Sequence, residues 1–385
     1  ELIAVDYEPL PANVDTATAI GPETVPVWDD CPDNISNLFE QGDKASVDAA
    51  FENAHHVTRQ RFVISRILPT AMEPRGCIGA YDRYEDRHTI YCAVGNIHAV
   101  RGLLAGDVFG VPENQFRVIC GDIGGAFGSK GVTAPENIIS LYASKKLGRP
   151  VKWVAERSEA LLADEHCRDN VSDVELALNE NGMFLALRVR TLCSLGAYLN
   201  SDRNLQATFG NLGSLAGVYR TPAIHVSVFG VFTHTMTTAT YRGAGRPEAT
   251  YLIEGIIDRA ARETGIDRVE LRRRNLIPPE AMPFKTGLIY TYDCGEFERN
   301  MDDATRMADV TGYEQRRRDS ETQGRLRGLG ITNPIERAGA PPGAETADIR
   351  FDPTGSVTLS VGTKSQGQGH DTMYKIILSE FLGVD

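Results

Sequence analysis

Residues 121–130 (GDIGGAFGSK) have the composition of a loop that binds a ligand through its backbone. Gly124, Gly125 and Gly128 lack the Cβ atoms that would keep a ligand away from the main chain. They also permit positive φ, which turns several N–H groups toward one anionic or oxo group, and Phe127 could form a wall beside them. The spacing differs from the phosphate-binding pattern G-x-x-x-x-G-K-S/T and from the dinucleotide pattern G-x-G-x-x-G. A tight turn that binds no ligand is the alternative for this segment taken alone.

Two further glycine-rich segments, residues 241–248 (YRGAGRPE) and 365–372 (SQGQGHDT), each precede a helical pattern. Arg242 in the first is a planar, permanent cation that could stabilise negative charge developing in a reaction. The alternative for this residue is an arginine that pairs with a carboxylate and holds the loop. In the other segment, side-chain amides stand at the start of a helix, where polar or anionic groups can be bound. We refer to residues 121–130, 241–248 and 365–372 as the first, second and third loops.

Helices and strands with clear end signals should position these loops. Residues 115–119 form a short β-prone run that leads into the first loop, and an amphipathic helix over residues 135–147 follows it. This helix begins with proline and is followed by glycine, an asymmetry typical of helix boundaries. Helices over residues 247–264 and 370–382 follow the second and third loops, and each is again followed by glycine.

The remaining pattern predicts an α/β fold in which helices pack on mixed sheets. The Asn181-Gly182 pair between two apolar runs is a strong hairpin signal. Three consecutive arginines, at positions 272–274, indicate a solvated helix face. The other expected elements are helices over residues 46–54, 97–109, 267–275 and 297–308, and strands over residues 2–10, 57–67, 77–81, 89–94, 151–155, 174–178, 184–199, 349–351 and 357–361.

Composition and charge argue against several classes of function. A net charge of −12 disfavours a nucleic-acid-binding surface, and no apolar run reaches the roughly 18 residues that a membrane span needs. The seven cysteines include no C-x-x-C pair, which disfavours a disulfide framework or an iron–sulfur site in this chain. The eight histidines include no H-E-x-x-H zinc motif. The first residues have no signal-peptide pattern, so we expect a cytoplasmic protein.

The three loops in this order, with Glu73-Pro74-Arg75 upstream, resemble the molybdopterin-binding large subunit of the xanthine oxidase family. The resemblance covers nearly the whole chain and is to carbon-monoxide-dehydrogenase-like large chains that lack the copper-binding cysteine. It implies molybdopterin-binding domains of the xanthine oxidase and aldehyde oxidase type. It also implies an oxidoreductase, a molybdenum hydroxylase that inserts oxygen from water into a C–H bond of an aldehyde or an N-heteroaromatic compound.

The resemblance assigns the first loop to the metal side of the cofactor. Backbone N–H groups there would meet an oxo ligand of molybdenum, and the matching residues are Gly124, Gly125, Ala126, Phe127 and Gly128. Ala126 stands where the family usually has glycine, and its methyl group is compatible with the loop if the residue keeps negative φ. The pterin would hold the metal without side-chain ligands. Glu73 and Arg75 would support the pocket as scaffold.

The other two loops receive their roles from the same resemblance. Arg242, Gly243 and Ala244 would line the substrate side, with Arg242 as the candidate catalytic residue that stabilises the substrate or an oxyanion. The third loop would approach the pterin and its cytosine dinucleotide extension through Gln366, Gly367, Gln368, Gly369 and His370.

Three features depart from the family pattern. Gly95 stands where the family usually has a glutamine that hydrogen-bonds an oxygen ligand of the metal. Gly243 stands where copper-containing carbon monoxide dehydrogenases have cysteine, which disfavours the oxidation of carbon monoxide. The family's general base is a glutamate near the C-terminal end of a longer subunit, and no residue before Asp385 can be assigned that role.

The sequence pattern and the resemblance together predict a domain organisation. Residues 1–15 would end a preceding α/β domain, 16–45 would connect, 46–310 would form a first molybdenum-cofactor-binding domain, and 325–385 would start a second, truncated one. We expect a fragment or one half of a split subunit, completed by a C-terminal half that supplies the catalytic glutamate. Electrons would leave through a 2Fe–2S small subunit and an FAD medium subunit. The alternatives are a non-catalytic cofactor-binding relative and an incomplete fragment without function.

Overall fold

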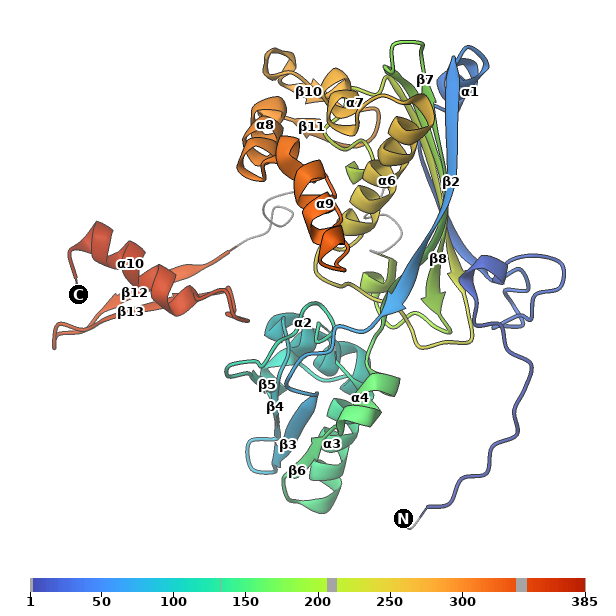
Figure 1. The fold of residues 1–385 in the computed structure, drawn as a ribbon. Helices are drawn as coiled ribbons and strands as arrows, with labels where there is room; N and C mark the ends of the chain where they lie inside the picture. The colour runs from blue at the N-terminus through green and yellow to red at the C-terminus, as the bar shows by residue number, and fades with distance from the viewer. Residues whose placement is uncertain (1–2, 132, 206–212, 337–344, 385) are drawn as a thin grey trace. The chain divides into compact units, whose positions relative to one another are not determined.

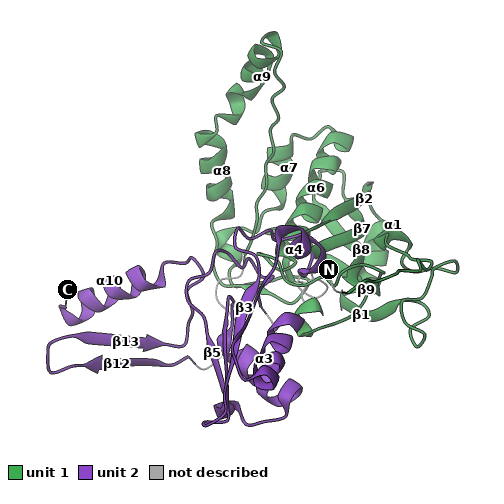
Figure 2. Cartoon of the chain, turned by 90° about the horizontal axis from the view of Figure 1, so that it is seen from below, with its two compact units in different colours: residues 1–67, 167–337 green, residues 68–166, 338–385 purple. Residues whose placement is uncertain are grey.

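The structure is a computed structural model that describes residues 3–131, 133–205, 213–336 and 345–384 (Figure 1). The chain divides into two compact units, and each combines two separate stretches of sequence (Figure 2). Unit 1 contains Glu1–Ile67 and Cys167–Arg337, and unit 2 contains Leu68–His166 and Ala338–Asp385. Both units combine helices with β-sheet, which confirms the expected α/β class.

Unit 1 is built on a five-stranded sheet in the order β1-β9-β8-β7-β2. Strands β8 and β9 run parallel, and the other neighbours are antiparallel. The predicted turn at Asn181-Gly182 joins β7 to β8, and Gly182 has a φ of +75°. The strands are β1 Ile35–Gly42, β2 His56–Ile67, β7 Cys167–Leu178, β8 Phe184–Gly196 and β9 Ala223–Phe232.

Two helices cover opposite faces of this sheet. Leu176 on β7 belongs to a core cluster with the apolar residues of α6 (Arg246–Thr264). Its neighbour Ala177 packs instead with Val47 of α1 (Lys44–Glu52). Because successive side chains of a strand point to opposite faces, α6 and α1 lie on different sides of the sheet.

Unit 2 contains a four-stranded sheet in the order β5-β4-β3-β6, with β4 and β5 parallel and the other neighbours antiparallel. Helix α3 (Pro135–Leu147) has the predicted bounds and packs closely on β3 at Gly79. A Cβ at Gly79 would lie 2.6 Å from the carbonyl carbon of Ser140, so glycine is required for this approach. The strands are β3 Gly76–Asp82, β4 Arg87–Cys92, β5 Phe116–Ile119 and β6 Val151–Val154.

The C-terminal part of unit 2 is a hairpin followed by a helix. Strand β12 (Ala347–Phe351) pairs antiparallel with β13 (Val357–Val361). Helix α10 (His370–Leu382) has the predicted bounds, and Gly383 follows it with a φ of +65°. The third loop therefore connects β13 to the N-terminus of α10.

Shorter elements complete both units. Asp267 caps α7, as expected, by accepting hydrogen bonds from the N–H groups of Val269 and Glu270. Among the helices of the described ranges, none is long and apolar enough to cross a membrane. The remaining longer elements are α2 Ile97–Gly102, the π-helical segment Leu103–Phe109, α4 Arg157–Ala163, α7 Arg268–Asn275, β10 Phe284–Lys285, β11 Thr291–Tyr292, α8 Phe297–Met307 and α9 Tyr313–Thr322.

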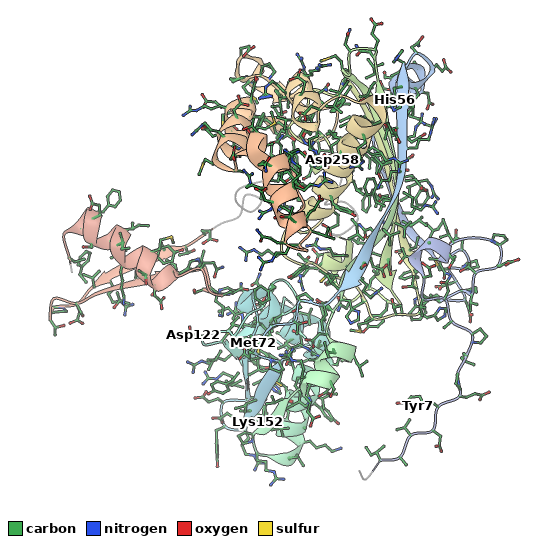
Figure 3. All side chains as sticks on the ribbon, in the orientation of Figure 1. Tyr7, His56, Met72, Asp122, Lys152 and Asp258 are labelled. Atoms are coloured by element: carbon green, nitrogen blue, oxygen red, sulfur yellow. The ribbon has the colours of Figure 1, made fainter. Side chains whose placement is uncertain are left out.

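Several sequence predictions for unit 1 were wrong. Ile35–Gly42, expected within an extended connection, forms β1, whose partner β9 lies far along the chain and leaves no local signal. Residues 3–10, expected as a strand, form no strand and are exposed, as Tyr7 in Figure 3 illustrates. Strand β8 ends at Gly196, which has a φ of +77°, instead of continuing to residue 199. The expected domain boundaries stay a prediction.

Arg272, expected on a solvated helix face, is fully buried. Its Nε lies 2.8 Å from Glu254 Oε2 and its Nη1 2.8 Å from Asp258 Oδ1, so two carboxylates of α6 compensate its charge (Asp258 is labelled in Figure 3). The Tyr219 hydroxyl donates to Glu254 Oε1 at 2.7 Å. The side chain of the next residue, Arg273, is 34% exposed. Successive helix residues are rotated by about 100°, so one of three adjacent arginines can face the core.

Replacing Arg272 with alanine should lower the free energy of unfolding by about 3–5 kcal/mol, because Glu254 would keep a buried charge without its partner. Arg273→Ala is the matched control. Arg273 pairs with Glu298 and Asp302 at the surface, and its loss should cost about 1 kcal/mol or less. Urea denaturation measures both values, and equally small losses would contradict the buried role of Arg272.

Candidate functional site

The first loop leaves β5 at Ile119 and adopts a strained backbone before α3. Gly125, Phe127 and Gly128 have φ values of +101°, +50° and +113°. Ala126 is not among the residues with positive φ, as its methyl group requires, and its side chain is buried. Phe127 is 45% exposed, and a left-handed φ at such a residue costs on the order of 1–3 kcal/mol. Strain of this kind is typical of positions that serve a site.

Glu73 fixes both ends of this loop. Its Oε2 accepts from the Gly124 N–H at 2.9 Å and lies 2.9 Å from Lys130 Nζ. The main chain adds two contacts, because the Glu73 N–H donates to the Gly124 carbonyl at 3.2 Å and Lys130 Nζ donates to the Glu73 carbonyl at 2.7 Å. Lys130 is 3% exposed, and this carboxylate is its counter-charge. A Cβ at Gly124 would lie 2.5 Å from Glu73 Cβ, which explains the glycine there.

Arg75 connects three elements of unit 2 near the first loop. Its Nε lies 2.5 Å from Asp164 Oδ1, and its Nη1 lies 2.8 Å from Glu136 Oε2. The guanidinium carbon lies 5.4 Å from the centre of the Trp153 ring. Arg75 therefore joins β6, the first turn of α3 and the end of α4, which are the contacts of a scaffold residue.

The third loop contacts Gly95, and Lys364, the residue just before the third loop, contacts the first loop within unit 2. Lys364 Nζ donates to the Gly121 carbonyl at 3.1 Å, and Gln366 Nε2 donates to the Gly95 carbonyl at 3.2 Å. The Gly95 N–H donates in turn to the Lys130 carbonyl at 2.8 Å. The structure thus brings together two of the three loops and the position at which the sequence departs from the family pattern.

Beyond Gln366 the third loop faces open space. Gly367 and Gly369 have φ values of +113° and +74°, and a Cβ at either position would meet no atom within 4 Å. Gln368 Oε1 accepts a hydrogen bond from the backbone N–H of Gln366. His370 begins α10, and its Nδ1 is buried without a hydrogen-bond partner among the described residues. A bound molecule could satisfy such a polar atom.

The second loop, in unit 1, has three consecutive residues in the left-handed conformation. Gly243, Ala244 and Gly245 have φ values of +100°, +47° and +92°. A Cβ at Gly243 would clash with the ring of Pro247, so the local packing disfavours cysteine at this position. The side chain of Arg242 is exposed, and its guanidinium has no hydrogen-bond or ion-pair partner in the part of the chain that the structure describes.

Arg168, which the sequence analysis missed, holds the second loop. Its Nη1 lies 2.5 Å from Glu248 Oε1, and its Nη2 donates to the Arg242 carbonyl at 3.2 Å. Its guanidinium carbon lies 5.1 Å from the centre of the Tyr241 ring, and Glu248 is only 3% exposed. An arginine that pairs with a carboxylate to hold the loop therefore exists, but it is Arg168 rather than Arg242. No motif marks position 168, so the sequence offered no signal for it.

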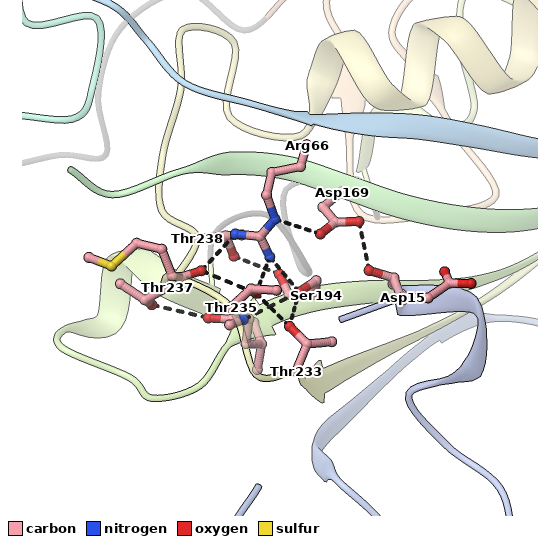
Figure 4. Close-up of polar contacts among 12 residues, drawn as sticks. Asp15, Arg66, Asp169, Ser194, Thr233, Thr235, Thr237 and Thr238 are labelled. Atoms are coloured by element: carbon pink, nitrogen blue, oxygen red, sulfur yellow. Dashed lines mark hydrogen bonds and ion pairs between the residues drawn. The ribbon is translucent and has the colours of Figure 1, made fainter. Parts of the chain in front are cut away.

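A polar network fixes the strand end that carries Arg168 (Figure 4). Arg168 and Asp169 have left-handed φ values of +65° and +71°. Asp169 Oδ2 accepts from Arg66 Nε at 2.8 Å, and its Oδ1 accepts from the Thr16 hydroxyl at 2.6 Å. Arg66 Nη2 also donates to the Ser194 hydroxyl at 2.9 Å. The network orients Asp169 toward the sheet and leaves Arg168 directed to the second loop.

The described side chains offer polar groups but no metal cluster. Within the described ranges, no group of three or more His, Cys, Asp or Glu side chains could hold a metal ion. The first and third loops belong to unit 2 and the second loop belongs to unit 1. The loops contain backbone N–H groups, side-chain amides, the exposed guanidinium of Arg242 and the exposed carboxylates of Asp122 and Asp371.

Glu73→Gln should lower the free energy of unfolding at neutral pH by about 1–3 kcal/mol, since the buried Lys130 ammonium loses its counter-charge. Burial opposes the ionisation of Glu73, but hydrogen bonds from Lys130 and Gly124 outweigh it and lower the pKa of the carboxyl below its usual 4.5. Its contribution to stability is therefore complete above about pH 4.5 and is lost as the pH falls through the lower folded-state pKa.

Urea denaturation of wild type and Glu73→Gln over the range from about pH 7 to about pH 3 measures this contribution. Glu85→Gln is the matched control, because Glu85 forms an exposed pair with Arg87 in the same unit. A stability difference between wild type and Glu73→Gln that stays constant over the whole range would show that the carboxylate charge does not hold the loop.

Gly243→Ala should destabilise the protein by about 1–3 kcal/mol more than Gly265→Ala, because a clash with Pro247 adds to the backbone strain. Gly265 is the matched control, since it has a φ of +73° but a Cβ there would meet no atom within 4 Å. Thermal or urea unfolding of the two variants measures the difference. Equal losses would mean that the second loop can move away from Pro247.

Comparisons with known proteins identify the family of the chain. A family model described as a molybdopterin cofactor-binding domain matches residues 27–276, and a second model with the same description matches residues 306–385. The carbon monoxide dehydrogenase large chain of Afipia carboxidovorans is 33% identical, and the match covers 100% of this chain and 51% of that protein. The 6-hydroxypseudooxynicotine dehydrogenase complex subunit gamma of Paenarthrobacter nicotinovorans is 32% identical over 100% of this chain and 48% of its own length.

A solved structure is also similar to this chain over its whole length. Quinoline 2-oxidoreductase from Pseudomonas putida 86 matches with a TM-score of 0.88 and 29% sequence identity, over 100% of this chain and 50% of that chain. The chain thus spans about half the length of the curated relatives it matches. Since the family models together cover most of the sequence, the chain belongs to the molybdopterin-binding large subunits of the xanthine oxidase family, as its three loops predict.

Proposed function

We propose that this chain is the molybdenum-cofactor-binding part of a hydroxylase that oxidises a C–H bond of an aldehyde or an N-heteroaromatic compound, with water as the oxygen source. The observation that carries the proposal is that hydrogen bonds from Lys364 and Gln366 hold the start of the third loop close to the first loop and to Gly95 in unit 2. The Lys364–Gly121 and Gln366–Gly95 hydrogen bonds link segments 243 and 271 residues apart. The two loops thereby contribute backbone N–H groups and side-chain amides to one unit.

The residues of unit 2 fit a molybdopterin cofactor. Open space lies beside Gly367 and Gly369, and His370 Nδ1 is a buried polar atom that lacks a partner among the described residues. The left-handed φ values in the first loop permit several of its N–H groups to turn toward one anionic or oxo group. When bound, the cofactor supplies oxygen insertion and two-electron chemistry. The residues of unit 2 that would hold it are Gly124, Gly125, Ala126, Phe127, Gly128, Gln366, Gly367, Gln368, Gly369 and His370. For unit 1, the assignment of Arg242, Gly243 and Ala244 to the cofactor rests on the resemblance alone.

The chain's own contribution is orientation and electrostatics. Glu73 and Lys130 keep the first loop in a fixed conformation, so its N–H groups need no reorganisation when a ligand binds. Arg242 presents a guanidinium that can stabilise negative charge on the substrate, while Arg168 holds the backbone of its loop. We assign no general base within residues 1–385. The proton transfer that a hydroxylase needs would therefore use a carboxylate from elsewhere in the complete enzyme.

The finer features of the enzyme also belong to the proposal. We assign the cytosine dinucleotide form of the cofactor, a cytoplasmic location, and electron transfer to a 2Fe–2S subunit and an FAD subunit. One relative is named as a subunit of a dehydrogenase complex, which supports a heteromeric assembly. We also propose two cofactor-binding domains that divide near residues 310–325. The separate family matches to residues 27–276 and 306–385 support the presence of two domains but not this boundary.

The choice of substrate class depends on the second loop. One relative is a carbon monoxide dehydrogenase, but the glycine at position 243 and its packing against Pro247 disfavour the cysteine of the copper-containing enzymes. The solved relative is named for quinoline, an N-heteroaromatic compound. We therefore favour aldehydes and N-heteroaromatic compounds over carbon monoxide.

A non-catalytic relative that binds the cofactor is the second candidate. The observation in its favour is Gly95, which replaces a glutamine of the family pattern with a residue that has no side chain. Such a protein would contain the cofactor and would not turn over substrate.

The deciding experiment uses the complete protein that contains this chain, purified with its accompanying subunits. We expect near-stoichiometric molybdenum by elemental analysis and pterin by fluorescence of the denatured extract. With a dye as electron acceptor, aldehydes or N-heteroaromatic compounds should be oxidised, and 18O from labelled water should appear in the product. Carbon monoxide should give no reduction of the dye.

The other outcomes separate the alternatives. Molybdenum and pterin without turnover of any substrate in these classes would favour the non-catalytic relative. The absence of both, in a host that makes the cofactor, would overturn the proposal. Oxidation of carbon monoxide would contradict the substrate assignment alone.

A further inference from the structure

The side chain of Gln366 occupies the space next to Gly95. A Cβ built on Gly95 would lie 3.2 Å from Gln366 Oε1 and 3.3 Å from its Nε2. Gln366 Nε2 also donates to the Gly95 carbonyl at 3.2 Å. The missing side chain at position 95 and the carboxamide at position 366 are therefore features of one contact.

The backbone at position 95 is fixed. The Gly95 N–H donates to the Lys130 carbonyl at 2.8 Å, and Lys130 is itself buried against Glu73. Asn96 then caps α2 by accepting from the Ala99 N–H at 3.0 Å. Gly95 is not among the glycines with positive φ, so its conformation alone does not require glycine. A methyl group at this position would press on the carboxamide of Gln366, which would have to shift by a few tenths of an ångström.

The carboxamide of Gln366 keeps bonding capacity after this contact. A side-chain amide has two N–H donors and one oxygen with two lone pairs. Among the described residues, only one N–H is used, by the Gly95 carbonyl. The other N–H and the oxygen remain for a ligand beside the open face of Gly367 and Gly369.

We propose that Gln366 supplies, from the third loop, the amide contact to the cofactor that position 95 cannot supply, and that Gly95 is small because Gln366 fills its place. The inference rests on the proposed function. If it is right, Gly95 is no longer an argument against catalysis, because the glutamine at position 366 replaces the glutamine that the family has at position 95. It also predicts that the effects on turnover of substitutions at positions 95 and 366 depend on one another. If Gln366 only anchored the loop, turnover would not need to show this dependence.

The first test needs no cofactor and measures the coupling by thermal unfolding of the complete protein. In a Gln366→Ala background, Gly95→Ala should raise the Tm by about 1–3 °C, because alanine restricts the unfolded chain. In the wild-type background the new methyl group would crowd the carboxamide, and the gain should vanish or reverse. Equal shifts in the two backgrounds would overturn the shared contact.

The second test exchanges the two residues in the purified holoenzyme. Gln366→Ala should lower turnover per bound molybdenum by on the order of 100-fold, the effect of losing one positioned donor. It should also speed the loss of molybdenum on gel filtration severalfold. Gly95→Gln combined with Gln366→Ala should bring turnover back to within about tenfold of wild type, because the amide returns from the other position. Gln323→Ala, an exposed glutamine of unit 1, is the control and should change neither value.

The outcomes distinguish this inference from the proposed function. If wild type contains molybdenum and turns over substrate while Gln366→Ala behaves like Gln323→Ala, the inference is wrong and the proposed function stands. If the exchange variant is as inactive as Gln366→Ala, Gln366 is an anchor only, and the inference is again overturned. A wild-type protein without molybdenum and pterin would overturn both.

Discussion

The candidate site in unit 2 depends on the ion pair between Glu73 and the buried ammonium of Lys130. An ammonium removed from water needs a counter-charge nearby, so this pair fixes the end of the first loop against the segment before β3. The same carboxylate accepts from Gly124, which fixes the start of the loop. The Lys130 carbonyl then binds the N–H of Gly95, and the Gly95 carbonyl binds Gln366. One charge pair thus determines how two distant loops meet.

In unit 1, an ion pair likewise holds the second loop. Arg168 and the buried carboxylate of Glu248 form an ion pair beneath the second loop, and the guanidinium also binds the Arg242 carbonyl. Arg168 thereby holds the backbone of the second loop, and the side chain of Arg242 remains exposed. In both units, an ion pair fixes the strained backbone of a loop that we propose to bind the ligand. These ion pairs explain why the strained φ values of Phe127 and Ala244 persist.

Local signals in the sequence were sufficient for the elements around the loops. The helices after the first and third loops begin and end where proline, glycine and the apolar period predict, and Ala126 avoids positive φ as its side chain requires. Contacts between distant segments could not be predicted. The pairing of β1 with β9, the burial of Arg272 against α6 and the contact of Arg168 with Glu248 each join segments without a shared motif. An arginine has the same sequence signature whether it faces water or a buried carboxylate.

The glycines of these loops are of two kinds, which differ in what lies next to them. At Gly124, Gly243 and Gly95 the absent side chain makes room for protein atoms, those of Glu73, Pro247 and Gln366. At Gly367 and Gly369 the same absence leaves open space that no described atom fills. Glycines of the first kind let the loop pack closely against other protein atoms. Glycines of the second kind leave open space beside the loop. A glycine at position 95 therefore does not by itself mean a lost function, since the group that fills its place is an amide with unused donor and acceptor atoms.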